Sequence, residues 1–171
     1  MGVVGLNADA ATIANCGAPS GWAYYAQGGL VGADNAGWDK SQISGGRTTL
    51  TFSTEGIFDV LYVDATGAIS SATAEGATIR PIRFGANEIT VTILYPGATF
   101  EIYSYVRDGS GKPQLLTLQS RGPDSLFTNA TVMVAPCELL DIEALDRMVD
   151  AGAAAAAATD AAAAGAATAR K

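Results

Sequence analysis

The sequence predicts an all-β fold: an antiparallel meander of about eight or nine short strands, with a C-terminal α-helix and an alanine-rich tail. The chain holds 20 glycines in 171 residues and only 16% charged residues, a composition that suits a turn-rich β-domain. Apolar and polar residues alternate with period two through much of its middle part. No helix-period segment separates these stretches, so parallel crossovers are not expected. The meander is expected to fold as a β-sandwich or a closed barrel.

Four candidate strands lie in the first half of the chain. Residues 48–54 alternate clearly, with Leu50 and Phe52 on one face and hydroxyl residues on the other, the pattern of a strand with one buried face. The turn-forming residues 64–67 predict a hairpin between the third and fourth strands. The four strands are expected at residues 22–26, 48–54, 57–63 and 68–72.

Five more strands are expected in the second half. Pro81 interrupts the first of them, and because proline cannot donate a backbone hydrogen bond, this strand is expected at a sheet edge or a bulge. The next two strands place Ile89, Val91, Ile93 and Tyr95 on one face, and Phe100, Ile102 and Val106 opposite Glu101, Tyr103 and Tyr105. The five strands are expected at residues 78–84, 88–95, 99–106, 114–120 and 126–135.

The chain has two cysteines, Cys16 and Cys137, which bracket the strand-rich part. Redox and metal sites normally use closely spaced cysteines, so a structural disulfide is expected, although two separate reduced core cysteines are the alternative. Closing a loop of about 100 residues removes unfolded-state entropy equivalent to roughly 4.7 kcal/mol. The pair defines a β-domain over residues 16–137 and pins the leader to the last strand.

The disulfide favours a periplasmic or extracellular location. The leader, residues 1–15, is interpreted as a remnant of a signal segment or a stretch downstream of one, although no intact signal peptide precedes Cys16. An ordinary cytosolic leader is the alternative.

Beyond Cys137 the period changes. Over residues 138–150, Leu139, Ile142, Leu145 and Val149 recur at three- and four-residue steps, which predicts an amphipathic helix. This apolar stripe can dock on the β-domain or join copies of the chain into a homo-oligomer. The alanine-rich residues 151–171 are expected to be helical or flexible, and no transmembrane span is expected.

Composition excludes several functions. The chain has no histidine, which excludes Ser-His-Asp and Cys-His catalysis and imidazole metal ligation. The net charge of −7 and the scattered lysines and arginines argue against a nucleic-acid partner. No catalytic residue set and no cofactor is predicted.

Two groups of residues are candidate sites. Asp34 and Asp39 lie in a glycine-rich segment that resembles a weak calcium site, although such residues are also ordinary turn formers. The second group consists of aromatic residues and one carboxylate that together suit stacking on a sugar ring, although simple packing is the alternative. Its members are Trp22, Tyr24, Trp38, Glu101, Tyr103 and Tyr105.

These observations favour a non-enzymatic, exported binding or surface module whose ligand is a glycan, a lipid or a protein. A closed meander with a cavity for a small apolar ligand is a variant of this hypothesis. The alternative is a structural or assembly protein of an envelope or virion surface that oligomerises through the C-terminal helix. An enzyme using carboxylates, tyrosine, lysine or arginine is a third hypothesis.

Overall fold

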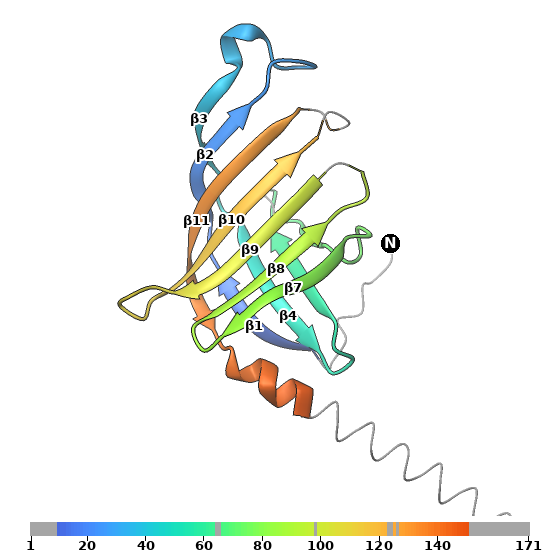
Figure 1. The fold of residues 1–171 in the computed structure, drawn as a ribbon, viewed down its shortest axis with the longest axis vertical. Helices are drawn as coiled ribbons and strands as arrows, with labels where there is room; N and C mark the ends of the chain where they lie inside the picture. The colour runs from blue at the N-terminus through green and yellow to red at the C-terminus, as the bar shows by residue number, and fades with distance from the viewer. Residues whose placement is uncertain (1–9, 64–65, 98, 123–124, 126, 151–171) are drawn as a thin grey trace, which may run out of the picture.

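The structure is a computed structural model, and it describes residues 10–63, 66–97, 99–122, 125 and 127–150. The predictions for the leader before residue 10, for the turn residues 64–65 and for the tail 151–171 lie outside the described residues. The predicted fold class is confirmed: the chain forms antiparallel β-structure followed by a short C-terminal helix over residues 143–150 (Figure 1).

Eleven strands are found in the described residues, and all nine predicted strands are among them. The two strands that the sequence did not predict as such are β1 and β3. The strands are β1 (Ala10–Cys16), β2 (Ser20–Tyr25), β3 (Gly37–Gln42), β4 (Arg47–Ser53), β5 (Phe58–Val63), β6 (Ile69–Ser71), β7 (Thr78–Gly85), β8 (Glu88–Leu94), β9 (Thr99–Arg107), β10 (Pro113–Arg121) and β11 (Asn129–Leu140).

Nine of these strands form one sheet in the order β6-β5-β4-β1-β11-β10-β9-β8-β7. The sheet curls into a half-barrel, so that β7 to β11 form a front wall and β1 and β4 lie behind it (Figure 1). The remaining strands, β2 and β3, pair with each other, and β2 also pairs with β11. They form a hairpin that extends beyond the upper end of the half-barrel (Figure 1).

The longest strand, β11, holds the two parts of the sheet together. One of its edges pairs with β10, and the other pairs first with β2 and then with β1. Pro136 lies where this second edge changes partner, between Val134, which pairs with Ser20, and Cys137, which pairs with Cys16. A proline is tolerated there because this edge of β11 is between its two partners, β2 and β1, so the N–H that proline lacks is not needed for a hydrogen bond in the ladder.

Proline and bulges also curve the sheet. β7 is an edge strand and its register shifts between Pro81 and Arg83, which confirms the prediction for Pro81. β1 shifts register between Thr12 and Ala14. The extra residue, Ile13, is fully buried in the core, as expected where a bulge turns a side chain inward.

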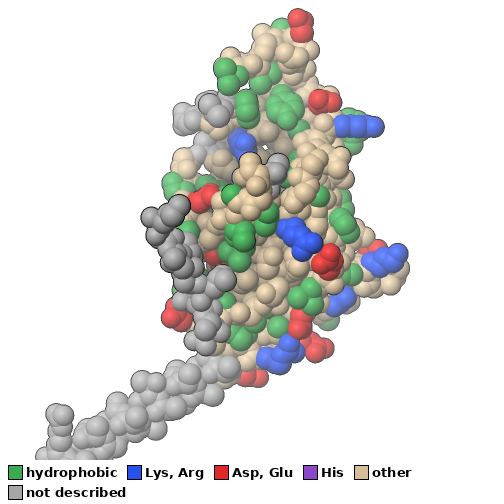
Figure 2. Space-filling model, turned by 180° about the vertical axis from the view of Figure 1, so that it is seen from behind, with side chains coloured by type: hydrophobic (Ala, Val, Ile, Leu, Met, Phe, Trp, Pro, Cys, Tyr) green, Lys and Arg blue, Asp and Glu red, His purple; other side chains and the backbone are tan. Residues whose placement is uncertain are grey.

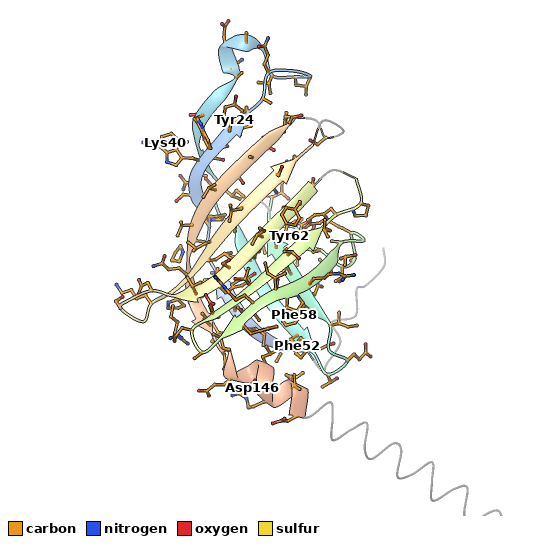
Figure 3. The ribbon with its side chains drawn as sticks, in the orientation of Figure 1. Tyr24, Lys40, Phe52, Phe58, Tyr62 and Asp146 are labelled. Atoms are coloured by element: carbon orange, nitrogen blue, oxygen red, sulfur yellow. A yellow bond between two sulfur atoms is a disulfide. The ribbon has the colours of Figure 1, made fainter. Side chains whose placement is uncertain are left out.

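The core fills the lower part of the half-barrel. It combines apolar residues of the front wall, such as Ile89 and Leu115, with Leu50 and Val60 of the back wall. Phe52 and Phe58 lie near the lower end (Figure 3), and the ring of Phe58 lies 6.2 Å from that of Phe84 on β7. These rings contact across the two ends of the sheet and help to close its seam.

The C-terminal helix lies below the lower end of the half-barrel (Figure 1). Asp141 N–H donates to the carbonyl oxygen of Ile13 at 2.7 Å, and Asp141 Oδ1 accepts from Ala144 N–H at 3.0 Å, which is an N-cap bond. Ile142 and Leu145 pack against the core. The stretch predicted as helix from residue 138 is therefore corrected: residues 138–140 extend β11, because the pairing with β1 overrides the local helical period.

The predicted disulfide is present. Cys16 and Cys137 are bonded, and they are also paired in the ladder between β1 and β11. The bond therefore joins the first strand to the last, as expected. No helix in the described part of the chain is both long and apolar enough to cross a membrane.

Candidate functional site

A cavity of about 610 Å³ opens in the upper half of the half-barrel, on the side away from the C-terminal helix. Its front wall comes from β9, β10 and β11, and its back wall comes from the start of β4 and the end of β5. Tyr62 lies on the back wall and marks the position of the cavity in Figure 3. The volume is within the range of about 300–1,000 Å³ that is typical of small-molecule sites.

Glu101 is the most unusual residue of the cavity. Its side chain is only 5% exposed, and one carboxyl oxygen, Oε1, accepts a hydrogen bond from Gln119 Nε2. The other oxygen, Oε2, has no hydrogen-bond partner among the described residues. Burial raises the pKa of this carboxyl, and the interactions with Gln119, Tyr103 and Arg121 partly oppose that effect. The Tyr103 hydroxyl is therefore the second wall group that interacts with this carboxyl, but Oε2 stays a buried acceptor without a well-formed hydrogen bond in the described part of the chain.

Three tyrosines line the cavity around this carboxyl. Tyr62 lies on β5, Tyr95 follows β8, and Tyr103 lies on β9. Burial and the nearby Glu75 raise the pKa of Tyr62 to about 12. Burial, with the charge of Glu101, also holds the pKa values of Tyr95 and Tyr103 above the ordinary value. All three phenols are therefore neutral near pH 7 and offer both aromatic faces and hydroxyl groups.

Among the residues that the structure describes, four charged ones line the cavity: Glu75, Glu101, Arg47 and Arg121. None of these four belongs to an ion pair within 4 Å, because the ion pairs of the described chain involve only Arg83 and Arg147 as cations. Two carboxylates and two guanidinium groups thus line the same cavity without forming ion pairs with each other.

The strands of the front wall present polar residues to the cavity and apolar residues to the outside. On β10, Thr117 and Gln119 line the cavity, whereas Leu116 and Leu118 are 37% and 47% exposed. On β11, Thr131 lines the cavity and Val132 is half exposed. This arrangement reverses the usual pattern of a half-buried sheet.

The aromatic residues predicted as one site lie in two places. Glu101 and Tyr103 line the cavity, and Tyr105 lies deeper on the same strand face, fully buried, with its ring 6.4 Å from that of Tyr103. The others lie on the β2–β3 hairpin, where Trp22 pairs with the exposed Val132 and Tyr24 (labelled in Figure 3) pairs with Trp38. There the Tyr24 and Trp38 rings are 5.4 Å apart.

The outer aromatic group is strongly exposed. Trp22 is 51% exposed and Trp38 is 64% exposed, and Lys40 Nζ lies 5.9 Å from the centre of the Trp22 ring, within cation–π range. Figure 2 shows hydrophobic side chains on this upper part, and acidic and basic side chains interspersed over the rest of that face. The sequence did not separate these two groups, because strand alternation does not say which face is enclosed.

The candidate calcium residues lie on different elements. Asp34 is in the short 3₁₀-helix η1 (Ala33–Asn35) and Asp39 is in β3. Asp39 Oδ1 accepts the N–H of Lys40 at 2.7 Å. In the residues that the structure describes, no three acidic or cysteine side chains gather as a group that can hold a metal ion.

Several cavity residues were not singled out from the sequence. Tyr62, Glu75 and Tyr95 come from different strands or loops, and Gln119 and Arg121 both lie on β10. Only the curling of the sheet brings these segments together. One feature of the sequence could have pointed to these residues: on β10, Thr117, Gln119 and Arg121 alternate with leucine and serine. This alternation indicates a polar face of the strand, but it does not show that the polar face is the inner one.

A second, more apolar groove lies at the lower end, between the C-terminal helix and Phe52, Phe58 and Phe84. Of the stripe predicted for the helix, Ile142, Leu145 and Val149 line this groove. Leu139 lies on β11 and is 39% exposed. The described stripe therefore packs in part against the chain's own β-structure.

In comparisons with known proteins, no family model, no curated protein and no solved structure matches the chain.

Proposed function

We propose that this chain is a non-enzymatic binding module that holds a small organic ligand in the cavity of the half-barrel. The observation that carries the proposal is Glu101, which lines a cavity of about 610 Å³ and whose buried Oε2 makes no hydrogen bond among the described residues. Buried polar atoms are normally hydrogen-bonded, and an unsatisfied one costs about 1–3 kcal/mol. A ligand that donates a hydrogen bond to this oxygen removes that cost.

The lining favours a ligand of mixed polarity. Three tyrosine faces suit a ring or an aliphatic body, and the surrounding polar groups suit hydroxyl, amine or acidic groups. A sugar unit or the headgroup of a lipid has this size and character. Both belong to the ligand classes expected from the sequence, whereas a protein ligand has to use a different surface.

Export is part of the proposal. The bond between Cys16 and Cys137 supports a periplasmic or extracellular location, because disulfides persist in oxidising compartments. Thiol alkylation followed by mass spectrometry, on protein from its own host, tests this point. Two alkylated cysteines contradict export, and two protected ones support it.

Filling the cavity tests the binding proposal. Thr131 is 7% exposed and lines the cavity, whereas the next residue, Val132, is 50% exposed on the outer face. Thr131→Phe should abolish binding of a fluorescent apolar probe such as anilinonaphthalene sulfonate, and Val132→Phe should leave it unchanged. Equal probe binding by Thr131→Phe and wild type contradicts a ligand site in this cavity.

A second candidate is the assembly role, in which copies of this chain associate. It is favoured by the exposed apolar outer face, where Leu118 and Val132 are neighbours across β10 and β11 and where large apolar patches often mark interfaces. Native mass spectrometry tests it: the Leu118→Asp, Val132→Asp double variant should dissociate an oligomer to monomers. Replacing Leu139 and Val149 with aspartate instead tests the C-terminal stripe without removing the end of β11.

A further inference from the structure

We infer that Glu101 binds a positively charged amine of the ligand, so that the ligand is an amino sugar or a lipid headgroup that carries a primary amine. This inference rests on the proposed function and specifies its ligand class. The two sources share one chemistry, an ammonium group on a small polar body, and the experiment below distinguishes them.

The Glu101 carboxyl lacks a positively charged partner at ion-pair distance in the described part of the chain. It is 5% exposed, and Oε2 makes no hydrogen bond among the described residues. A buried carboxylate is costly unless it is both paired and hydrogen-bonded. An ammonium group supplies a charge and three donors at once, and the resulting charge-assisted hydrogen bond is about twice as strong as a neutral one.

Aromatic and acidic side chains share the cavity with Glu101. Tyr62, Tyr95 and Tyr103 line the same cavity, and Glu75 adds a second carboxylate there. Tyrosine faces attract cations by about 0.5–2 kcal/mol, with the larger values at desolvated sites. A neutral hydroxyl can donate a hydrogen bond to Glu101, but it gains nothing from these ring faces or from the second negative charge.

The two arginines of the cavity do not oppose this assignment. Arg121 lies two residues beyond Gln119 on the same face of β10, and its charge lowers the pKa of Glu101, which helps to keep the carboxyl ionised. Arg47 belongs to the back wall and is exposed. Both remain available for a hydroxyl or phosphate oxygen elsewhere on the ligand.

Binding of an amine is coupled to loss of the proton from the Glu101 carboxyl. Burial raises the pKa of Glu101, and Glu75 acts in the same direction. The ionised form binds an ammonium group, so affinity should increase as the pH rises through this raised pKa and a proton should be released on binding. Among the described residues, the titratable and charged groups that line the cavity with Glu101 or interact with it are Arg47, Tyr62, Glu75, Tyr95, Tyr103, Tyr105 and Arg121.

The experiment is isothermal titration calorimetry of the full chain with two matched pairs of probes. Glucosamine is compared with glucose, and glycerophosphoethanolamine with the glycerophosphate ester of ethylene glycol, so that each pair differs at an amine replaced by a hydroxyl. We expect the amine of one pair to bind at least tenfold more tightly than its partner, and that pair identifies the source. Glu101→Gln should abolish the preference, whereas Glu138→Gln, an exposed glutamate on β11, should retain it.

The wild type alone also tests the inference, so it does not depend on the folding of a variant. Amine affinity should fall at least fivefold from pH 7.5 to pH 5. If neutral probes bind as tightly as amines, if affinity is flat or increases toward low pH, or if a folded Glu101→Gln variant keeps the preference, the inference is overturned while the proposed function stands. If Thr131→Phe does not affect apolar-probe binding and no matched probe binds, the proposed function fails with it.

Discussion

At the scale of single residues, Glu101 shows how a sheet can enclose a polar group. Its neighbours on the inner face of β9 are Tyr103 and Tyr105, and Gln119 of β10 hydrogen-bonds one of its carboxyl oxygens. The other oxygen makes no hydrogen bond among the described residues, which lowers the stability of the fold. Under the proposed function, the same oxygen is the group that recognises the ligand.

Replacing Glu101 with glutamine is expected to stabilise the empty protein at neutral pH. Because burial raises the pKa of the carboxyl, the folded state holds the proton more tightly than the unfolded chain. Protonation of Glu101 therefore contributes to the free energy of unfolding. This contribution is fully present below the pKa of the carboxyl in the unfolded chain, near 4.5, and it is lost as the pH rises through the pKa in the folded chain. Urea unfolding should show Glu101→Gln about 1 kcal/mol more stable than wild type at pH 8.

That gain should shrink toward pH 4, where the wild-type carboxyl is protonated. Glu138→Gln, an exposed substitution on β11, is the control and should show no such pH-dependent difference. A Glu101→Gln variant that loses more stability at pH 8 than at pH 4 contradicts the expected direction.

At the scale of elements, the disulfide and the ladder fasten β1 to β11 at the same point. Removing the bond should cost roughly 2–4 kcal/mol, because it frees a long loop in the unfolded chain. We expect the Cys16→Ala, Cys137→Ala variant to show this loss in guanidinium unfolding. Reductant should destabilise the wild type by a similar amount and leave the double variant unchanged; an equal effect on both would show that the loss comes from elsewhere.

The start of the C-terminal helix depends on Asp141. Its carboxylate accepts the N–H of Ala144 at 3.0 Å and lies 2.8 Å from Arg147 Nη2. Asp141→Ala should cost about 1 kcal/mol of stability through loss of the N-cap. Asp141→Asn, which keeps a capping oxygen, should retain most of it.

Asp146, on the same helix (Figure 3), provides a matched control because it makes no capping bond with the helix start. Asp146→Ala should change the unfolding free energy by less than about 0.5 kcal/mol. A loss equal to that of Asp141→Ala would indicate that surface charge, not capping, accounts for the effect.

At the scale of the whole molecule, stability should decrease from the middle of the sheet toward its edges. β10 and β11 have hydrogen-bonded neighbours on both sides, whereas β3 and β7 pair on one side only within the described strands. Amide hydrogen exchange should therefore be slowest in β10 and β11 and fastest in β3 and β7. Protection of β3 or β7 equal to that of β10 would show that another segment or molecule covers those edges.

The cavity also belongs to this scale, because no single element contains it. Arg47 and Tyr62 come from the back wall and Thr117 and Thr131 from the front wall. The bulges in β1 and β7 and the crossing of β11 from β2 to β1 give the curvature that places these residues opposite one another. The functional proposal thus depends on the shape of the sheet more than on any local motif.

Local patterns were sufficient to determine the fold class, nine of the strands, the edge position of Pro81 and the disulfide, because alternation, proline chemistry and cysteine spacing act over short stretches or through one covalent bond. Tertiary structure alone decided which face of β9 and β10 is enclosed, since alternation is symmetrical between the two faces. It also decided that residues 138–140 continue β11, because pairing with β1 outweighs a helical period. Glu101, Tyr62 and Arg121 meet in one cavity because the whole sheet is curved. This curvature exists only after the strands have paired, so no local stretch of sequence reveals it.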